Sequence, residues 1–120
     1  MATLLICAFL SNPLSQGTLY FLVNENQEII GGIVINHADT KRGHLHAGIV
    51  PWHRGKGYGT AMLCLALKEC KRMGINKVHI CPNSTENKAA IQTILNNGGY
   101  LLNAFKENEV RFDRYEISII

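Results

Sequence analysis

The chain has 120 residues, of which 47% are hydrophobic and 18% charged, and its formal net charge at pH 7 is +3. This length and composition are those of one ordinary globular domain, here residues 1–120, and exclude a fibrous or disordered protein. The small positive charge falls well short of the basic surface that nucleic-acid binding requires, so we expect no nucleic-acid partner.

The cysteines and the N-terminal segment bear on the compartment. Four cysteines occur without a C-x-x-C pair or the close spacing of a zinc site or disulfide framework: Cys7, Cys64, Cys70 and Cys81. The apolar run at residues 2–10 has no preceding Lys or Arg and is too short to span a bilayer. We interpret it as a core strand or the remnant of an element that continued upstream. A cytoplasmic protein with reduced thiols and no membrane partner is expected.

The first part of the chain predicts antiparallel strands. Residues 18–23 are β-branched and aromatic, the polar residues 24–27 form a turn, and residues 28–35 return as a second strand. Gly31 and Gly32 within that strand suggest a bulge or a close backbone contact. A surface loop at residues 37–43 leads to a further strand.

This further strand, residues 44–50, delivers a glycine-rich loop. Its alternation places one set of residues on a common face: His44, His46, Gly48 and Val50. Residues 57–73 then show the spacing of an amphipathic helix, with Gly74 as its stop signal. Trp52 is expected to pack beneath the loop.

The remaining segments complete an α/β (α+β) arrangement. Residues 77–81 form a short strand reached through a helix, so we expect it to lie parallel to the strand at 44–50. Residues 83–87 are rich in N-cap types and precede a second helix over 88–97. Two last strands, 100–105 and 110–119, form a hairpin. The prediction is a mixed, mostly antiparallel sheet of about six strands with two main helices.

The loop between the strand and the first helix has the composition of an anion-binding site. Gly55, Gly57 and Gly59 let the backbone approach a ligand closely, and the helix that follows presents free N–H groups. Arg54 and Lys56 add positive charge, which favours a phosphate or pyrophosphate. A nucleoside-triphosphate P-loop is excluded because glycine follows Lys56, and a dinucleotide fingerprint is excluded because the glycines are each two residues apart.

The stretch Arg54-Gly55-Lys56-Gly57-Tyr58-Gly59 resembles the acetyl-CoA signature R-x-x-G-x-G/A of the GCN5-related N-acetyltransferases. The approach Gly43-His44-Leu45-His46-Ala47-Gly48-Ile49-Val50-Pro51 resembles a group of small bacterial predicted acetyltransferases in that family, and the likeness runs from about residue 18 to residue 120. It implies a truncated fold of this family and an acetyl-CoA co-substrate. The residues implied to bind acetyl-CoA are Ile49, Val50, Pro51, Arg54, Gly55, Lys56, Gly57, Tyr58, Gly59, Thr60 and Asn87.

The resemblance also implies a reaction, in which the primary amine of an acceptor attacks the thioester directly. The family often places an acidic Tyr seven residues after the Asn of the second helix, and here that position is Ile94. His46 is the candidate base, because imidazole titrates near neutrality and the strand alternation places it on the face of Val50. Cys81 could accept an acyl group, although a buried strand-end thiol explains it more simply. His44 and His46 lack a third ligand, so we expect no metal.

The N-terminal part departs from the family. Only seventeen residues precede Thr18, where the family normally has a strand and two helices that wall the acceptor pocket. Either the chain is truncated, or a partner covers the exposed side, or the acceptor site is open. We expect a homodimer, since a bare sheet face would expose apolar surface. The alternative to an enzyme is a non-catalytic CoA-binding or protein-interaction module.

Overall fold

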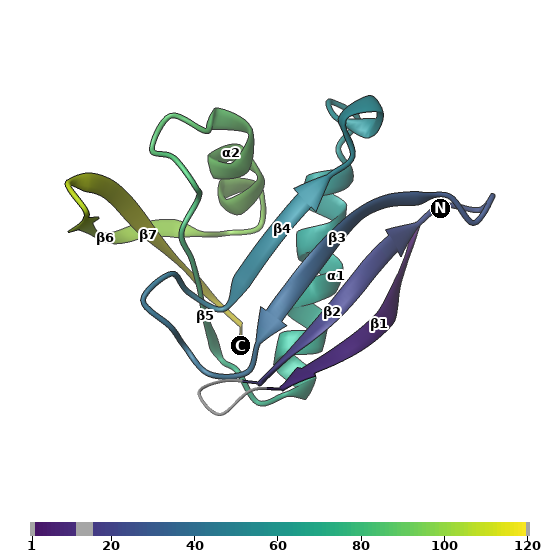
Figure 1. Cartoon of the computed structure of the whole chain (residues 1–120), viewed down its shortest axis with the longest axis horizontal. Helices are drawn as coiled ribbons and strands as arrows, with labels where there is room; N and C mark the ends of the chain where they lie inside the picture. Colours follow the sequence, from purple (N-terminus) through teal and green to yellow (C-terminus); the bar gives the residue numbers. More distant parts are fainter. Residues whose placement is uncertain (1, 12–15, 120) are drawn as a thin grey trace.

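The computed structural model describes residues 2–11 and 16–119 (Figure 1). Within these residues the chain forms seven strands, two α-helices and one 3₁₀ turn. In chain order these elements are β1 (Thr3–Ser11), β2 (Gln16–Val23), β3 (Ile29–Asn36), β4 (Leu45–Ile49), η1 (Pro51–His53), α1 (Tyr58–Arg72), β5 (Lys77–Ile80), α2 (Lys88–Asn96), β6 (Tyr100–Glu107) and β7 (Val110–Ser118).

Strands β1 to β4 form an antiparallel sheet, called sheet A, in the order β1-β2-β3-β4. The predicted turn at residues 24–27 is confirmed, because the Asn24 carboxamide oxygen accepts the N–H groups of Asn26 at 2.9 Å and Glu28 at 3.0 Å. The predicted close contact is confirmed at Gly31, where an added Cβ would lie 2.5 Å from the Gly48 carbonyl oxygen.

Strands β5, β7 and β6 form a second antiparallel sheet, called sheet B. The predicted hairpin joins β6 to β7 through Asn108 and Glu109, which adopt left-handed φ values of 51° and 65°. A two-residue turn with both φ values positive matches the twist of the strands on either side, so it sets the register of the hairpin.

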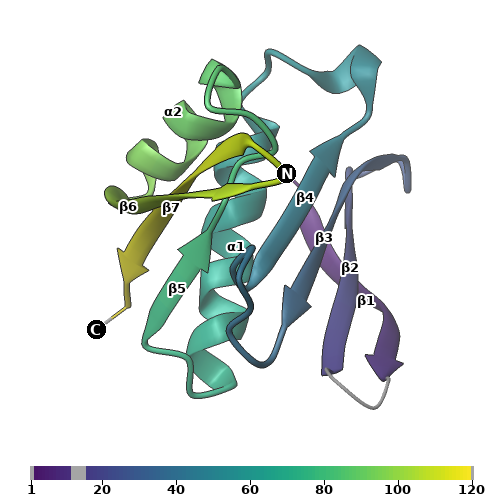
Figure 2. The ribbon, with the colours of Figure 1, turned by 60° about the vertical axis from the view of Figure 1, so that its left-hand side comes forward.

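The α/β class and the two helices agree with the prediction, but a single mixed sheet of about six strands does not. Strands β4 and β5 point the same way in Figure 2, yet no backbone ladder joins them. Among the described residues, the backbone pairing at this junction is one isolated antiparallel bridge, of Gly43 with Ile80. The reason is local. The His44 backbone N–H donates to the His79 carbonyl, but the His79 N–H donates to the His44 ring Nδ1 at 3.0 Å. A side chain thus takes the donor that a parallel ladder would use.

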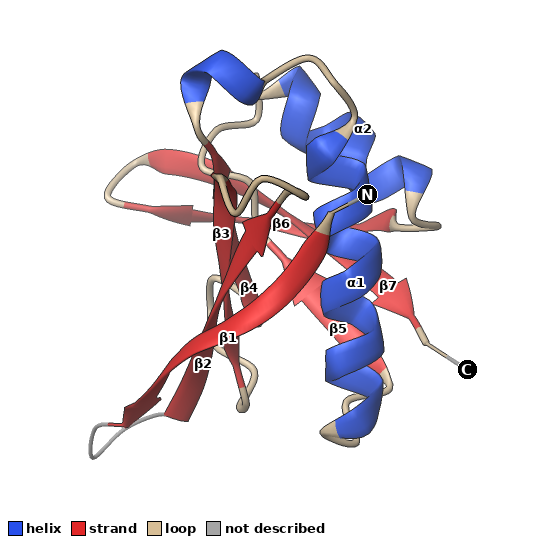
Figure 3. Cartoon of the chain, turned by 90° about the vertical axis from the view of Figure 1, so that its right-hand side faces the viewer, coloured by secondary structure: helices blue, strands red, loops and turns tan. Residues whose placement is uncertain are grey.

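Helix α1 lies along one face of sheet A (Figure 3). Its buried side chains, Met62, Leu63, Ala66 and Cys70, belong to one core cluster with Leu22, Ile33, Ile35 and Leu45 of the sheet. The helix ends as predicted at Gly74, where the Ile75 N–H bonds the Cys70 carbonyl and the Gly74 N–H bonds the Lys71 carbonyl. The opposite face of sheet A, called the outer face, carries the half-buried Leu19, Phe21 and Val34.

Candidate functional site

The site begins at the free edge of β4. Val50 N–H donates to the Ile30 carbonyl, and the alternation of an antiparallel pair then turns the backbone groups of Ala47 and Ile49 away from β3. The Val50 carbonyl accepts from His53, so both backbone groups of Val50 are already paired. Ile49, Val50 and Pro51 are the residues at this strand end that were expected to bind acetyl-CoA. Of these three, Ile49 has the backbone N–H directed toward the free edge.

The loop after β4 is fixed by one arginine and two glycines. The Arg54 Nε donates to the Ile49 carbonyl at 3.1 Å, which ties the loop back to the strand end. Gly55 and Gly57 have φ values of 76° and 81°, and a Cβ added to either would meet nothing within 4 Å. The glycines are therefore required for the backbone conformation and not for space.

The beginning of α1 leaves backbone donors without partners in the helix. The first intrahelical bond runs from the Ala61 N–H to the Gly57 carbonyl, which leaves the N–H groups of Tyr58, Gly59 and Thr60 directed outward from the first turn. Gly57 occupies the N-cap and brings no side chain to cap them. Arg54 and Lys56 are exposed beside this turn. Free donors, a helix N-terminus and two cations together suit a phosphate-bearing anion.

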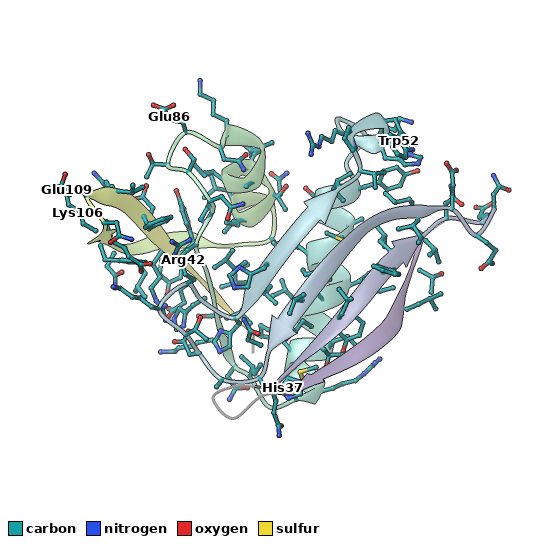
Figure 4. All side chains as sticks on the ribbon, in the orientation of Figure 1. His37, Arg42, Trp52, Glu86, Lys106 and Glu109 are labelled. Atoms are coloured by element: carbon teal, nitrogen blue, oxygen red, sulfur yellow. The ribbon has the colours of Figure 1, made fainter. Side chains whose placement is uncertain are left out.

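His53, and not Trp52, packs beneath the loop. The His53 side chain is buried against the edge of the Tyr58 ring at a centroid distance of 5.8 Å, and its Nε2 lies 3.3 Å from Glu28 Oε2. Trp52 is 70% exposed and lies at the tip of the η1 turn (Figure 4). The expectation for Trp52 was wrong because the 3₁₀ turn places consecutive residues about 120° apart, which directs the smaller ring inward.

Helix α2 docks against the first turn of α1. Asn87 is the N-cap of α2, and its side-chain oxygen accepts the Ala90 N–H at 3.1 Å. At the other end of the helix, the Asn97 side chain donates to the Thr60 carbonyl at 3.2 Å. Ile94, at the position where a Tyr acid is common, is 2% exposed and belongs to the core. Asn87 therefore has a structural role that leaves a ligand role open.

The two histidines of the strand have different surroundings. His46 is exposed on the outer face of sheet A, in one row with Val34 and Leu19. Partial desolvation, with the nearby charge of Arg42, lowers the pKa of His46. His44 is buried at the end of β5 instead, and its ring stacks on His79 at 5.7 Å.

Of the cysteines, Cys64, Cys70 and Cys81 are free, and the side chain of Cys7 lies outside the described part. Burial raises the pKa of the Cys81 thiol, and its Sγ lies 3.8 Å from the Lys41 carbonyl. A raised thiol pKa leaves little thiolate to act as a nucleophile, which supports the structural interpretation of Cys81.

A polar cluster at the junction of the two sheets was not predicted. His79 lies between two carboxylates, with Nδ1 2.9 Å from Asp39 Oδ2 and Nε2 2.9 Å from Glu116 Oε1. Arg114 contacts Asp39 and also donates to the Thr40 carbonyl at 2.8 Å. We call Asp39, His44, His79, Arg114 and Glu116 the junction cluster. Its members lie up to 77 residues apart in the sequence, which no local pattern relates.

The sequence was compared with models of known protein families. The family described as "Acetyltransferase (GNAT) family" matches residues 5–98, which is most of the chain. The chain belongs to the GNAT acetyltransferase family. No curated protein matches the sequence.

Solved structures of other proteins share the fold of this GNAT chain. A protein provisionally assigned as a phosphinothricin N-acetyltransferase is 19% identical with a TM-score of 0.70, covering 86% of this chain and 72% of its own. A provisionally assigned acetyltransferase from Acinetobacter baylyi is 14% identical with a TM-score of 0.72, covering 86% and 64%. The spermidine N-acetyltransferase of Vibrio cholerae, solved with CoA and spermine, is 18% identical with a TM-score of 0.69, covering 85% and 65%. The chain thus spans about two thirds of the length of these proteins.

Proposed function

We propose that this GNAT protein is an acetyl-CoA-dependent N-acetyltransferase that moves an acetyl group directly to a primary amine of a small-molecule or other amino-group acceptor. The observation that carries the proposal is the continuous path from the free edge of β4 to the uncapped first turn of α1. Ile49 would pair with the pantetheine arm, and the N–H groups from Gly55 to Thr60, with Arg54 and Lys56, would bind the pyrophosphate. Val50 and Pro51 would then line this path through their side chains.

The chemistry requires the amine nitrogen to bond to the acetyl carbon while the carbon–sulfur bond breaks, giving an amide and a free thiol. A proton must leave the ammonium form of the acceptor before attack, and another must reach the departing thiolate. His46 is our candidate for accepting the first proton, because it is exposed on the strand that would hold the thioester arm and its lowered pKa favours the neutral ring at pH 7.

One observation favours a second candidate function, a CoA-binding or protein-interaction module without catalysis. The position of the expected Tyr acid is Ile94, and this side chain is packed in the core. A protein that lacks this acid could still hold CoA through the loop and the first turn of α1, since neither depends on residue 94.

Release of free thiol from acetyl-CoA in the presence of a set of primary amines separates the two functions. The enzyme hypothesis predicts amine-dependent thiol release that is lost in Gly57→Asp together with cofactor binding. A protein that binds acetyl-CoA but releases no thiol with any amine of the set would support the module and contradict the enzyme.

We further propose that the protein acts as a homodimer in the cytoplasm. The outer face of sheet A supports the dimer, because Leu5 is 45% exposed there and Leu19, Phe21 and Val34 are half-buried.

The three free thiols among the described cysteines suit a reducing compartment. Neither α1 nor α2, the two α-helices of the described residues, is a candidate membrane span.

A further inference from the structure

The junction cluster joins the two sheets at the point where β4 and β5 separate. Asp39 comes from the loop between β3 and β4, His44 from the residue before β4, His79 from β5, and Arg114 and Glu116 from β7. Glu116 and His44 are 7% and 5% exposed, so their polar atoms depend on protein partners and not on water. The cluster links the chain before β4 to β5 and β7, beside the bridge of Gly43 with Ile80.

The hydrogen bonds constrain the protonation of the two histidines. An ionised carboxylate only accepts hydrogen bonds, and His79 has a carboxyl oxygen 2.9 Å from each ring nitrogen. With Asp39 and Glu116 both ionised, both nitrogens of His79 therefore donate. The His44 Nδ1 accepts the His79 backbone N–H and therefore carries no proton. Desolvation lowers the pKa of His44, and the positive charges of His79 and Arg114 lower it further, against the opposing effect of Asp39.

The charges in the cluster balance in this state. Asp39 and Glu116 contribute two negative charges, while Arg114 and a doubly protonated His79 contribute two positive charges, with His44 neutral. A neutral His79 would leave an ionised Glu116, 7% exposed, facing a nitrogen lone pair, which is costly at this depth. The competing state is a protonated Glu116 that donates to His79 Nε2, and it is distinguished by a bare nitrogen on His79.

A metal ion is the other occupant that the distances allow, since ligand atoms of Asp39, His44 and His79 lie within 4.8 Å of one another. The contacts argue against it. The His44 Nδ1 and both His79 ring nitrogens already have hydrogen-bond partners, and the Arg114 guanidinium contacts the Asp39 carboxylate that a cation would need. The observations favour a proton over a metal ion at this position.

We propose that His79 is an imidazolium that bridges Asp39 and Glu116 and thereby fixes the separation of β4 from β5. This proposal rests on the proposed function and makes His79 a positioning residue for the acetyl-CoA path. That path follows the free edge of β4, and the junction cluster holds His44, the residue just before β4. The bridge acts through the relative placement of the two sheets and involves no contact of His79 with the substrate.

Nitrogen-15 NMR of the histidine rings tests the charge state on the unliganded wild-type protein. At pH 7 we expect both His79 nitrogens to show protonated shifts, while His44 shows one protonated and one bare nitrogen in the same spectrum. A bare nitrogen on His79 would overturn the proposal. This measurement depends neither on acetyl-CoA nor on the folding of a variant.

Substitution tests the positioning role. His79→Gln is expected to lower the thermal midpoint by roughly 10 °C and to weaken acetyl-CoA binding. The matched control Arg111→Gln breaks the exposed Arg111–Asp113 pair on the same hairpin and should change neither quantity appreciably. Equal midpoints for the two variants, or acetyl-CoA binding by His79→Gln at the wild-type affinity, would overturn the positioning role. Failure of the wild type to bind acetyl-CoA would instead contradict the proposed function, and the ring spectra would still decide the state of His79.

Discussion

His44 and His46 are two residues apart in the chain and have different chemical roles in the structure. His44 is buried, accepts a backbone N–H through Nδ1 and stacks on His79. His46 is exposed in the row of Val34 and Leu19 and has a pKa lowered mainly by desolvation. A group that must take a proton from an ammonium needs a free lone pair at working pH, which His46 offers and His44 does not.

The His46 ring predicts the pH dependence of the proposed reaction. Because its pKa is lowered, the neutral ring persists below the ordinary histidine value of about 6.5, so the acid limb of kcat/KM should have its midpoint below that pH. His46→Gln should remove this limb and reduce kcat by about 10²-fold or more. His37→Gln is the control, since His37 is exposed and bonds Thr18 at 3.0 Å. Figure 4 places it at the other end of the molecule from Trp52. An acid limb that is unchanged in His46→Gln would contradict the role.

At the scale of the elements, the features that sequence reasoning predicted are those set by local chemistry. The turn at 24–27, the glycine at the end of α1 and the Asn87 cap each depend on residues within a few positions of one another. The sequence could not predict the separate sheets, because the His79 N–H is taken by a ring 35 residues away. The junction cluster was not predicted for the same reason, since isolated Asp, His and Glu residues are typical of any surface loop or strand.

The pairing of β3 with β4 makes a prediction about two adjacent glycines. An alanine Cβ at Gly31 would lie 2.5 Å from the Gly48 carbonyl, so Gly31→Ala must push the strands apart and should lower the free energy of unfolding by about 1–3 kcal/mol. At Gly32 the nearest atom, in Phe21, is 3.4 Å away, and Gly32→Ala should be nearly neutral. Denaturant unfolding of both variants checks this, and equal losses would contradict the register described for these strands.

The start of α2 gives a second prediction. Asn87→Ala removes the acceptor of the Ala90 N–H and should cost about 1 kcal/mol of stability. The exposed Asn83, outside the helix, serves as the control through Asn83→Ala. If Asn87 also contacts acetyl-CoA, its variant will lose affinity beyond what the stability change explains. Unchanged affinity would restrict Asn87 to its capping role.

At the scale of the whole molecule, the partly exposed apolar side chains on the outer face of sheet A favour binding of a partner. Strands β1 and β2 are adjacent in the sheet, and four residues lie between Ser11 and Gln16. Leu5 and Phe21 pair across these strands on the outer face, next to Gly32 of β3. A second copy of the chain placed on this face would cover the apolar row and would also form a wall beside His46.

Sedimentation at micromolar concentration checks the homodimer. The wild type is expected to sediment as a dimer, and Phe21→Lys should shift it to a monomer by placing a charge in the centre of the outer face. Leu95→Lys, at an apolar position on α2 that is 46% exposed, should remain dimeric. A monomeric wild type would contradict the prediction directly.

The central claim is that the first turn of α1 binds the pyrophosphate of acetyl-CoA, and calorimetric titration with acetyl-CoA tests it most directly. Gly57 and Gly74 lie at opposite ends of α1 with φ values of 81° and 82°, and a Cβ at either position meets nothing within 4 Å, so an aspartate strains both sites alike. We predict that Gly74→Asp binds like the wild type, whereas Gly57→Asp, which brings a carboxylate to the proposed pyrophosphate site, binds at least about tenfold more weakly. Equal affinities of the wild type and both variants would contradict the claim.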